Sequence, residues 1–316
     1  MSLMPRRTAL KAGAAALAAG ALTAPATAPA VAAGRVPRAA EVDDREWMGR
    51  LDDGVPLTGL TVPGTHDSCC TDPLHGTEWS HTQNWGIPDQ LQRGIRFLDI
   101  RCNGLEGTAS ELGIYHSDNY QYIRLQDVLN QCTSFLSAHA GEVVVMRIKN
   151  EYAGGNRLDA AEFQRRIDYY LDDFGFRRWF WTDARWPALG EARGRIVLVA
   201  DFENPWSVIQ WSSGTNDWFD TQDRWDGVEN SQKARLVTAQ FDKAFLDPGA
   251  TRMFANFTSF SGGLDFPRHN ARFIMPEVFA YLDARKAERA RFGIVPMDFP
   301  DQYPAILRLL IDKNFV

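Results

Sequence analysis

The sequence lacks the features that mark several common classes of protein. After residue 33 it has no uninterrupted apolar run of the ~18 residues that a membrane-spanning helix needs. It has no excess of basic residues either, because 34 Lys and Arg stand against 40 Asp and Glu, for a net charge of −6. Since an acidic protein is repelled by nucleic acid, we expect no nucleic-acid partner. No low-complexity linker or internal repeat divides the later chain, which favours a single domain.

Cysteine is also scarce, and the positions of the cysteines are compatible with either disulfides or a zinc site. The four cysteines are Cys69, Cys70, Cys102 and Cys132. In an exported chain they could form one or two disulfides, and a bridge between the loop at residues 69–70 and Cys102 is reasonable if the strands before them are neighbours. The alternative is a zinc site, whose spacing would match no common zinc pattern. Its ligands would be Cys69, Cys70, His75 and His81.

The first 33 residues have the pattern of an export signal. Arg6-Arg7-Thr8-Ala9-Leu10-Lys11 is a twin-arginine pattern, followed by an Ala-rich stretch and by small residues near Ala30-Val31-Ala32. We therefore predict that residues 1–33 are a signal of the Tat type and that the protein is secreted. Cleavage would remove three basic residues and no acid, which takes the net charge from −6 to −9.

The rest of the chain alternates apolar runs with helical patterns. This alternation predicts an α/β fold with parallel strands joined by crossover helices. The predicted strands are 58–62, 95–101, 112–116, 142–149, 195–201, 252–258 and 292–298. The predicted helices are 84–94, 123–139, 158–175, 231–246, 273–290 and 302–312. A barrel and an open doubly wound sheet would both gather the carboxyl ends of such strands at one edge.

Titratable side chains lie where three of these strands end. Val62-Pro63-Gly64-Thr65-His66-Asp67-Ser68 places a histidine beside a carboxylate, Asp99-Ile100-Arg101 ends the next strand, and Tyr115-His116-Ser117 ends the third. Two histidines could serve as base and acid in phosphodiester cleavage, and an arginine fork could hold the phosphate oxygens. These groups would supply what cleavage of a phosphodiester without a metal requires.

These segments, in this order, resemble the X region of phosphatidylinositol-specific phospholipase C, especially the secreted bacterial enzymes. The likeness continues through Met146–Tyr152, Gly194–Leu198, Asn256–Ser259 and Val295–Phe299, so it covers nearly the whole chain after about residue 45. The resemblance implies a single irregular TIM-like (β/α) barrel over residues 34–316. It also implies an enzyme that converts phosphatidylinositol to diacylglycerol and inositol 1,2-cyclic phosphate, and that could also cleave glycosylphosphatidylinositol anchors.

The resemblance also implies roles for individual residues. His66 would take the proton of the inositol 2-hydroxyl, supported by Asp298. His116 would protonate the diacylglycerol oxygen, together with Asp67. Arg101 would hold the phosphate, with Asp99 orienting the groups around it.

The same comparison predicts that the enzyme needs no metal or other cofactor. Calcium-dependent members of the family carry acidic ligands where this chain has Arg101 and Lys149. Calcium requires several hard oxygen donors, so an arginine and a lysine at these positions remove ligands and add repulsion.

Headgroup and membrane contacts are the remaining expectations. Asp223 and Trp225 align with the family's headgroup pocket, and Lys149 is a further substrate-binding candidate, whereas Asp201 stands where the family has an arginine. We expect a monomer that adsorbs transiently to a membrane surface through tryptophans. The candidates for this contact are Trp79, Trp85, Trp206, Trp211 and Trp218.

Two other functions stay open at this level. A metal-dependent glycerophosphodiesterase or sphingomyelinase D-like barrel also uses paired histidines, but it needs acidic metal ligands. A catalytically inert lipid- or sugar-phosphate-binding module would have lost at least one proton-transfer group, and none is missing here.

Overall fold

The computed structural model describes residues 42–151, 157–204, 206–261 and 265–315. The predicted signal at residues 1–33 lies outside this part of the chain. All described residues belong to one compact unit, Val36–Val316. None of the described helices is long and apolar enough to cross a lipid bilayer.

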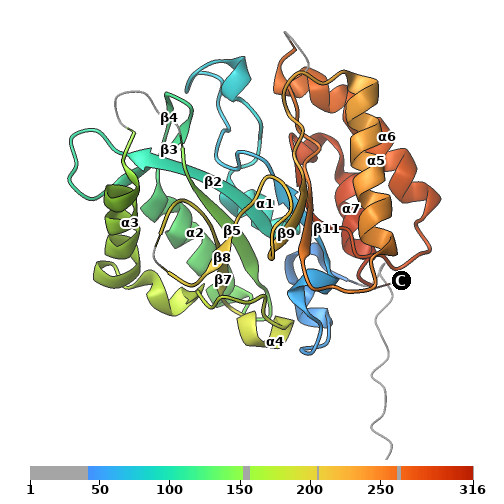
Figure 1. Ribbon diagram of the computed structural model, residues 1–316, viewed down its shortest axis with the longest axis horizontal. Coiled ribbons are helices and arrows are strands. Elements are labelled where there is room, and N and C mark those ends of the chain that lie inside the picture. Colours follow the sequence, from blue (N-terminus) through green and yellow to red (C-terminus); the bar gives the residue numbers. More distant parts are fainter. Residues whose placement is uncertain (1–41, 152–156, 205, 262–264, 316) are drawn as a thin grey trace, which may run out of the picture. The chain divides into compact units, whose positions relative to one another are not determined.

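The unit is built on a curled, mostly parallel sheet flanked by helices (Figure 1). Its main strands are β1 (Thr61–Thr65), β2 (Phe97–Gly104), β5 (Val144–Asn150), β7 (Ile196–Asp201), β9 (Phe219–Gln222), β10 (Met253–Asn256) and β11 (Gly293–Met297). Two short strands, β6 (Phe180–Trp181) and β8 (Ile209–Gln210), pair with β7. The order β6-β7-β5-β2-β1-β11-β10-β9 is parallel throughout, and among the described strands no pairing closes β9 onto β6. The predicted irregular TIM-like barrel is confirmed as an open α/β barrel.

The helices lie on the outer face of the sheet. They are α1 (Ile87–Gln92), α2 (Leu125–Ala138), α3 (Ala160–Asp168), α4 (Leu189–Ala192), α5 (Asn230–Leu246), α6 (Pro267–Ala284) and α7 (Pro304–Asp312). In Figure 1, α5, α6 and α7 stand together on one side and α2 and α3 on the other. The observed α6 begins at Pro267, six residues before the predicted helix 273–290, because a proline is well tolerated in the first turn.

One predicted parallel strand has a different place in the sheet. Residues 112–116 form β3 (Leu112–His116), which runs antiparallel to β2 and makes a hairpin with β4 (Asn119–Arg124). The connection from β2 to β3 contains no helix, and a short link of this kind joins antiparallel rather than parallel strands. His116 therefore reaches the site from the rim of the barrel.

Alternation along the strands separates two hydrophobic cores. On β5, Val144, Met146 and Ile148 point outward into the layer beneath the helices, while Val145 belongs to the inner cluster. The inner cluster also contains Val62, Phe97, Val197 and Ile294 from the neighbouring strands. Polar residues continue these inward rows toward the carboxyl ends of the strands, at alternating positions. They are His66, Asp99, Arg101, Arg147, Lys149, Asp201 and Asp298.

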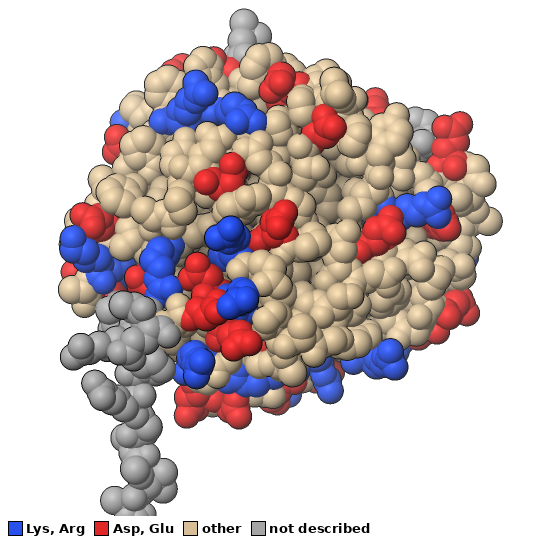
Figure 2. Space-filling view, turned by 180° about the vertical axis from the view of Figure 1, so that it is seen from behind, with Lys and Arg blue, Asp and Glu red and all other residues tan. Residues whose placement is uncertain are grey.

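Acidic and basic side chains are interspersed on one face of the unit. Figure 2 shows this face with blue and red residues intermixed and with broad uncharged areas. A surface of this kind is not a continuous basic track for a polyanion.

Candidate active site

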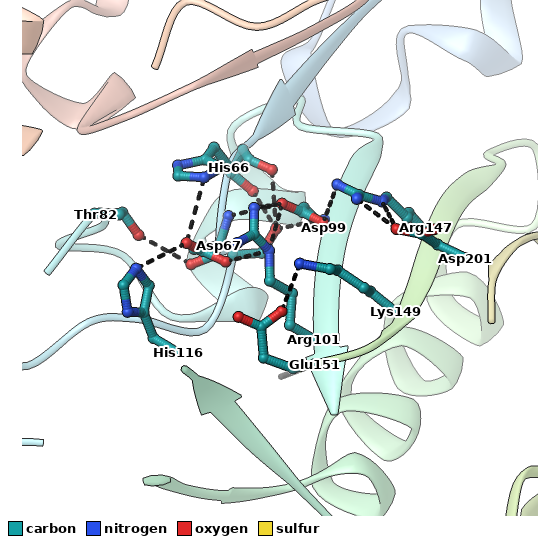
Figure 3. Close-up of polar contacts among 12 residues, drawn as sticks. His66, Asp67, Thr82, Asp99, Arg101, His116, Arg147, Lys149, Glu151 and Asp201 are labelled. Carbon is teal, nitrogen blue, oxygen red and sulfur yellow. Dashed lines mark hydrogen bonds and ion pairs between the residues drawn. The ribbon is translucent and has the colours of Figure 1, made fainter. Parts of the chain in front are cut away.

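The two predicted proton-transfer histidines lie beside the same carboxylate. His66 directly follows β1, and its Nε2 atom is 3.3 Å from Asp67 Oδ2. His116 ends β3, and its Nε2 atom is 3.5 Å from the same oxygen. Figure 3 shows Asp67 between the two imidazoles, with Arg101 beneath it. The structure thus brings these four predicted residues together.

His66 is held by carboxylates on both ring nitrogens. Its Nδ1 atom is 2.9 Å from Oδ1 of Asp298, which directly follows β11. Burial alone would lower the pKa of His66, but the negative charges of Asp67 and Asp298 outweigh it and raise the pKa to about 9. Burial raises the pKa of Asp298 itself. Both carboxylates would stabilise the imidazolium that forms when His66 accepts a proton.

Arg101 is bonded to both acids of the site. Its Nε atom is 2.5 Å from Asp67 Oδ1, and its Nη2 atom donates to Asp99 Oδ2 at 2.9 Å. Although burial opposes ionisation of Asp67, Arg101 and the two histidines hold its pKa below the ordinary value. Asp99 likewise has a lowered pKa despite its burial, chiefly because of Arg101 and Arg147. Both acids are therefore ionised at neutral pH.

A metal would compete with this guanidinium. His66, Asp67 and Asp99 place one ligand atom each within 4.8 Å of one another, which is close enough to share an ion. Arg101 already bonds to both of these carboxylates, however, and puts a fixed positive charge between them. A cation here would have to displace those contacts and tolerate the charge, so the donor set does not fit calcium well.

Lys149 and Glu151 form the next part of the site along β5. The Lys149 Nζ atom is 2.7 Å from Glu151 Oε2, and the other Glu151 oxygen accepts from the backbone N–H of Ser117 at 3.2 Å. Glu151 was not predicted as a site residue, and it links the end of β5 to the residue that follows His116. The signal for Glu151 in the sequence was an acidic residue two positions after Lys149, which lies near the end of β5.

These residues line a cavity of about 360 Å³. Its floor is the histidine, aspartate and arginine cluster, and Asp223 and Trp225 lie on its wall. Trp225 is 58 % exposed, so its ring is available at the mouth. Burial raises the pKa of Asp223. The structure therefore places Lys149, Asp223 and Trp225 around one hollow.

A buried lysine orders the segment that carries Asp223. Lys233, at the start of α5, donates to Gln222 Oε1 at 3.2 Å and to the Arg224 carbonyl at 3.0 Å. Burial lowers the pKa of this ammonium group to about 7. The sequence offered no sign of this role, because a lysine in a helix is ordinarily a surface residue.

Asp201 does not line this cavity, but Arg147 does. The Arg147 Nε atom donates to Asp201 Oδ2 at 3.0 Å, and its Nη1 atom donates to Asp99 Oδ1 at 3.1 Å. Arg147 was not predicted as a site residue. The signal for it in the sequence was its position on β5, two residues before Lys149 and therefore on the same face of the strand.

Two other sets of predictions need correction. All four cysteines are buried free thiols, so the predicted disulfides and the zinc alternative are absent from the described residues. Of the predicted membrane-facing tryptophans, only Trp79 lines the cavity. Trp211 is buried in the inner core, and the others are partly buried against core residues because their rings fill space beside the sheet. These others are Trp85, Trp206 and Trp218.

The chain is similar to known proteins over most of its length. The family model for the phosphatidylinositol-specific phospholipase C X domain matches residues 61–201. A 1-phosphatidylinositol phosphodiesterase from Staphylococcus aureus is 28 % identical over 299 residues, which cover 85 % of this chain and 93 % of that protein. The corresponding protein from Listeria monocytogenes is 27 % identical over 277 residues, covering 83 % of each chain.

Solved structures agree with these sequence matches. A phosphatidylinositol-specific phospholipase C structure from S. aureus has a TM-score of 0.76 at 26 % identity, covering 87 % of this chain and 98 % of that chain. The L. monocytogenes structure has a TM-score of 0.74 at 24 % identity and covers 86 % and 99 %, which shows the same fold.

Proposed function

Because the chain belongs to the X-domain family of phosphatidylinositol-specific phospholipase C, we propose that it cleaves phosphatidylinositol to diacylglycerol and inositol 1,2-cyclic phosphate. The same reaction could release proteins from glycosylphosphatidylinositol anchors, which carry the same phosphodiester. The observation that carries the proposal is that His66 and His116 both lie within 3.5 Å of one oxygen of Asp67, above the guanidinium of Arg101.

The first half of the reaction forms a bond from the substrate's own hydroxyl. His66 takes the proton of the inositol 2-hydroxyl, and that oxygen attacks the phosphorus. Asp298 and Asp67 stabilise the resulting imidazolium at 2.9 and 3.3 Å. An intramolecular nucleophile gains much of its rate from proximity.

The second half breaks the bond to the lipid. The P–O bond to glycerol cleaves, and His116 donates a proton to the departing alkoxide. Arg101 would bind the non-bridging oxygens, where negative charge is concentrated, and Lys149 would add a second cation at the rim. Asp99 fixes Arg101 through the 2.9 Å bond.

We also propose that the protein is exported and acts as a monomer at a membrane surface. The acidic net charge, −6 for the full chain and −9 after the predicted cleavage, argues against strong electrostatic adsorption to anionic lipid. Aromatic rings at and beside the cavity mouth would instead supply a transient contact. These are the exposed Trp225 and Phe266 and the half-buried Trp79, whose ring centroid is 4.9 Å from that of Phe266.

Turnover of phosphatidylinositol in mixed micelles with excess EDTA tests this function. We expect full activity in EDTA, a loss of at least about 10²-fold in His66→Gln, and no change in His139→Gln, whose ring lies at the end of α2. Activity that appears only after calcium is added would favour the metal-dependent phosphodiesterase. Binding of phosphatidylinositol without turnover in either condition would favour the inert binding module.

A further inference from the structure

Arg147 is a buried cation on the wall of the active-site cavity whose contacts fix it in one orientation. It lies in the inward row of β5, between Asp99 on β2 and Asp201 on β7, and it is 5 % exposed (Figure 3). The Asp201 carboxylate bonds its Nε and Nη2 atoms at 3.0 and 2.5 Å. The guanidinium carbon also lies 4.4 Å from the ring centroid of Trp211, which packs against one face of the group.

These contacts leave hydrogen-bond donors unused. A guanidinium has five N–H groups, and the bonds to Asp99 and Asp201 occupy three of them within the described part of the chain. One N–H on Nη1 and one on Nη2 remain. Arg147 lines the cavity, so its guanidinium can meet a bound molecule there.

The charge around Arg147 favours a neutral acceptor. Two carboxylates already pair with the guanidinium, and Asp223 lies on the wall of the same cavity. Arg101 and Lys149 line the same cavity, and each is also paired with carboxylates, Arg101 with Asp67 and Asp99 and Lys149 with Glu151. Arg147 therefore offers directional N–H groups with little net charge, and a hydroxyl oxygen is the acceptor that matches them.

We propose that Arg147 binds the hydroxyl groups of the inositol ring and that Asp201 is the positioning residue that aims it. This inference rests on the proposed function of the site. It also gives a physical reason for Asp201 where the resemblance implies an arginine. In this chain the guanidinium comes from β5, and the acid on β7 holds it in place.

Steady-state kinetics and inhibition by free myo-inositol test this assignment. For Arg147→Met we expect KM for phosphatidylinositol and Ki for myo-inositol to rise about tenfold, the loss of roughly one good hydrogen bond. Asp201→Asn should raise both values a few-fold, because the guanidinium is present but less well aimed. The paired variant Arg147→Asp with Asp201→Arg reverses the ion pair and should recover part of the affinity.

Two controls separate binding from structure. Arg185→Met removes an exposed arginine that does not line the cavity, and it should change neither constant. Should Arg147→Met fail to fold, Arg147→Lys keeps the charge and one contact but loses the two spare N–H groups, so its KM and Ki should still rise.

A fall in kcat or Tm with unchanged KM and Ki would overturn the assignment and make Arg147 a structural residue. The proposed function fails in a different way, since the wild-type protein would then not turn over phosphatidylinositol at all.

Discussion

Three residues of the active site share a backbone feature. The residue that directly follows each of His66, His116 and Asp298 has a positive φ angle. These φ angles are 43° at Asp67, 51° at Ser117 and 49° at Phe299. This conformation is uncommon outside glycine and costs roughly 1–3 kcal/mol per residue. Each of the three backbone N–H groups has a fixed acceptor. These acceptors are Asp99 Oδ2, Glu151 Oε1 and the Thr82 carbonyl. The hydrogen bonds hold sharp turns, and the turns aim the three proton-handling side chains into one cavity.

Removal of Asp298 should shift the titration of His66. In Asp298→Asn the ring loses one of the two negative charges that raise its pKa, so the pKa should fall from about 9. Because a lower pKa yields the neutral base at lower pH, the acidic limb of the kcat/KM profile should move toward lower pH. The value of kcat should also fall about 10²-fold or more. NMR titration of His66 measures the shift, and an unchanged or raised pKa would contradict the electrostatic account.

The role of His116 predicts a dependence on the leaving group. In His116→Ala, cleavage of phosphatidylinositol should slow about 10²- to 10⁴-fold, because the alkoxide departs without a proton donor. A substrate with a nitrophenolate leaving group needs no such proton, so its cleavage should slow much less. Kinetics with both substrates check this, and equal losses would show that His116 serves binding or structure.

The sequence was informative about this cluster because its residues end apolar runs. His66, Asp99 and Arg101 were recognisable from that position and from the resemblance. Arg147 was not, because a charge inside a continuous apolar run does not reveal which partner neutralises it. Its partner Asp201 is 54 residues away, and only the pairing of β5 with β7 brings the two together.

At the scale of elements, β11 shows how a strand sets the position of a site residue. It pairs with β1 over five residues and with β10, and it carries Asp298 at its end. Its first residue, Gly293, has a φ of 70°, and a Cβ there would overlap the carbonyl of Phe254 on β10. The entry of the strand into the sheet therefore depends on a glycine.

Gly293→Ala should destabilise the protein by about 3 kcal/mol or more and reduce activity, because β11 must shift and move Asp298. Gly175→Ala is the matched control, since Gly175 has a similar φ of 76° but no atom within 4 Å of the added Cβ. It should cost only about 1 kcal/mol. Denaturant unfolding compares the two, and equal losses would mean that φ alone, rather than the close approach to β10, matters.

Strands with long apolar runs were predicted correctly. Strands whose direction depends on pairing with another strand, or that are very short, were not. The continuous runs of β5 and β7 were located within about two residues of their observed ends. The direction of β3 was wrong, because antiparallel pairing with β2 is a tertiary choice. The short strands β6, β8 and β9 were missed, since two to four residues carry no periodicity that can be recognised.

At the scale of the whole unit, a buried ion pair connects the amino-terminal segment to the base of the barrel. Arg96 and Glu142 have fully buried side chains 2.8 Å apart. Glu142 also accepts from the backbone N–H groups of Met48 and Gly49, and Arg96 donates to the Arg45 carbonyl. This network lies at the amino ends of β2 and β5, away from the catalytic residues.

Glu142→Ala should lower the free energy of unfolding by about 3–5 kcal/mol, because it leaves Arg96 buried without its counter-charge. The activity of the folded fraction at low temperature should stay normal. Arg185→Ala breaks the exposed pair with Glu191 and should change the free energy of unfolding little, because water screens both charges. Chemical denaturation of both variants checks the contrast, and a small loss in Glu142→Ala would show that water reaches the pair.

Phosphorus NMR of the products tests the central claim most directly. Vesicles of phosphatidylinositol are incubated with the protein in excess EDTA, and the spectrum is followed from the first minutes. The arrangement of His66, His116 and Arg101 predicts that inositol 1,2-cyclic phosphate appears first, before any inositol 1-phosphate. Direct appearance of inositol 1-phosphate would mean that water is the attacking group. A product that forms only after calcium is added would show that Arg101 does not replace a metal.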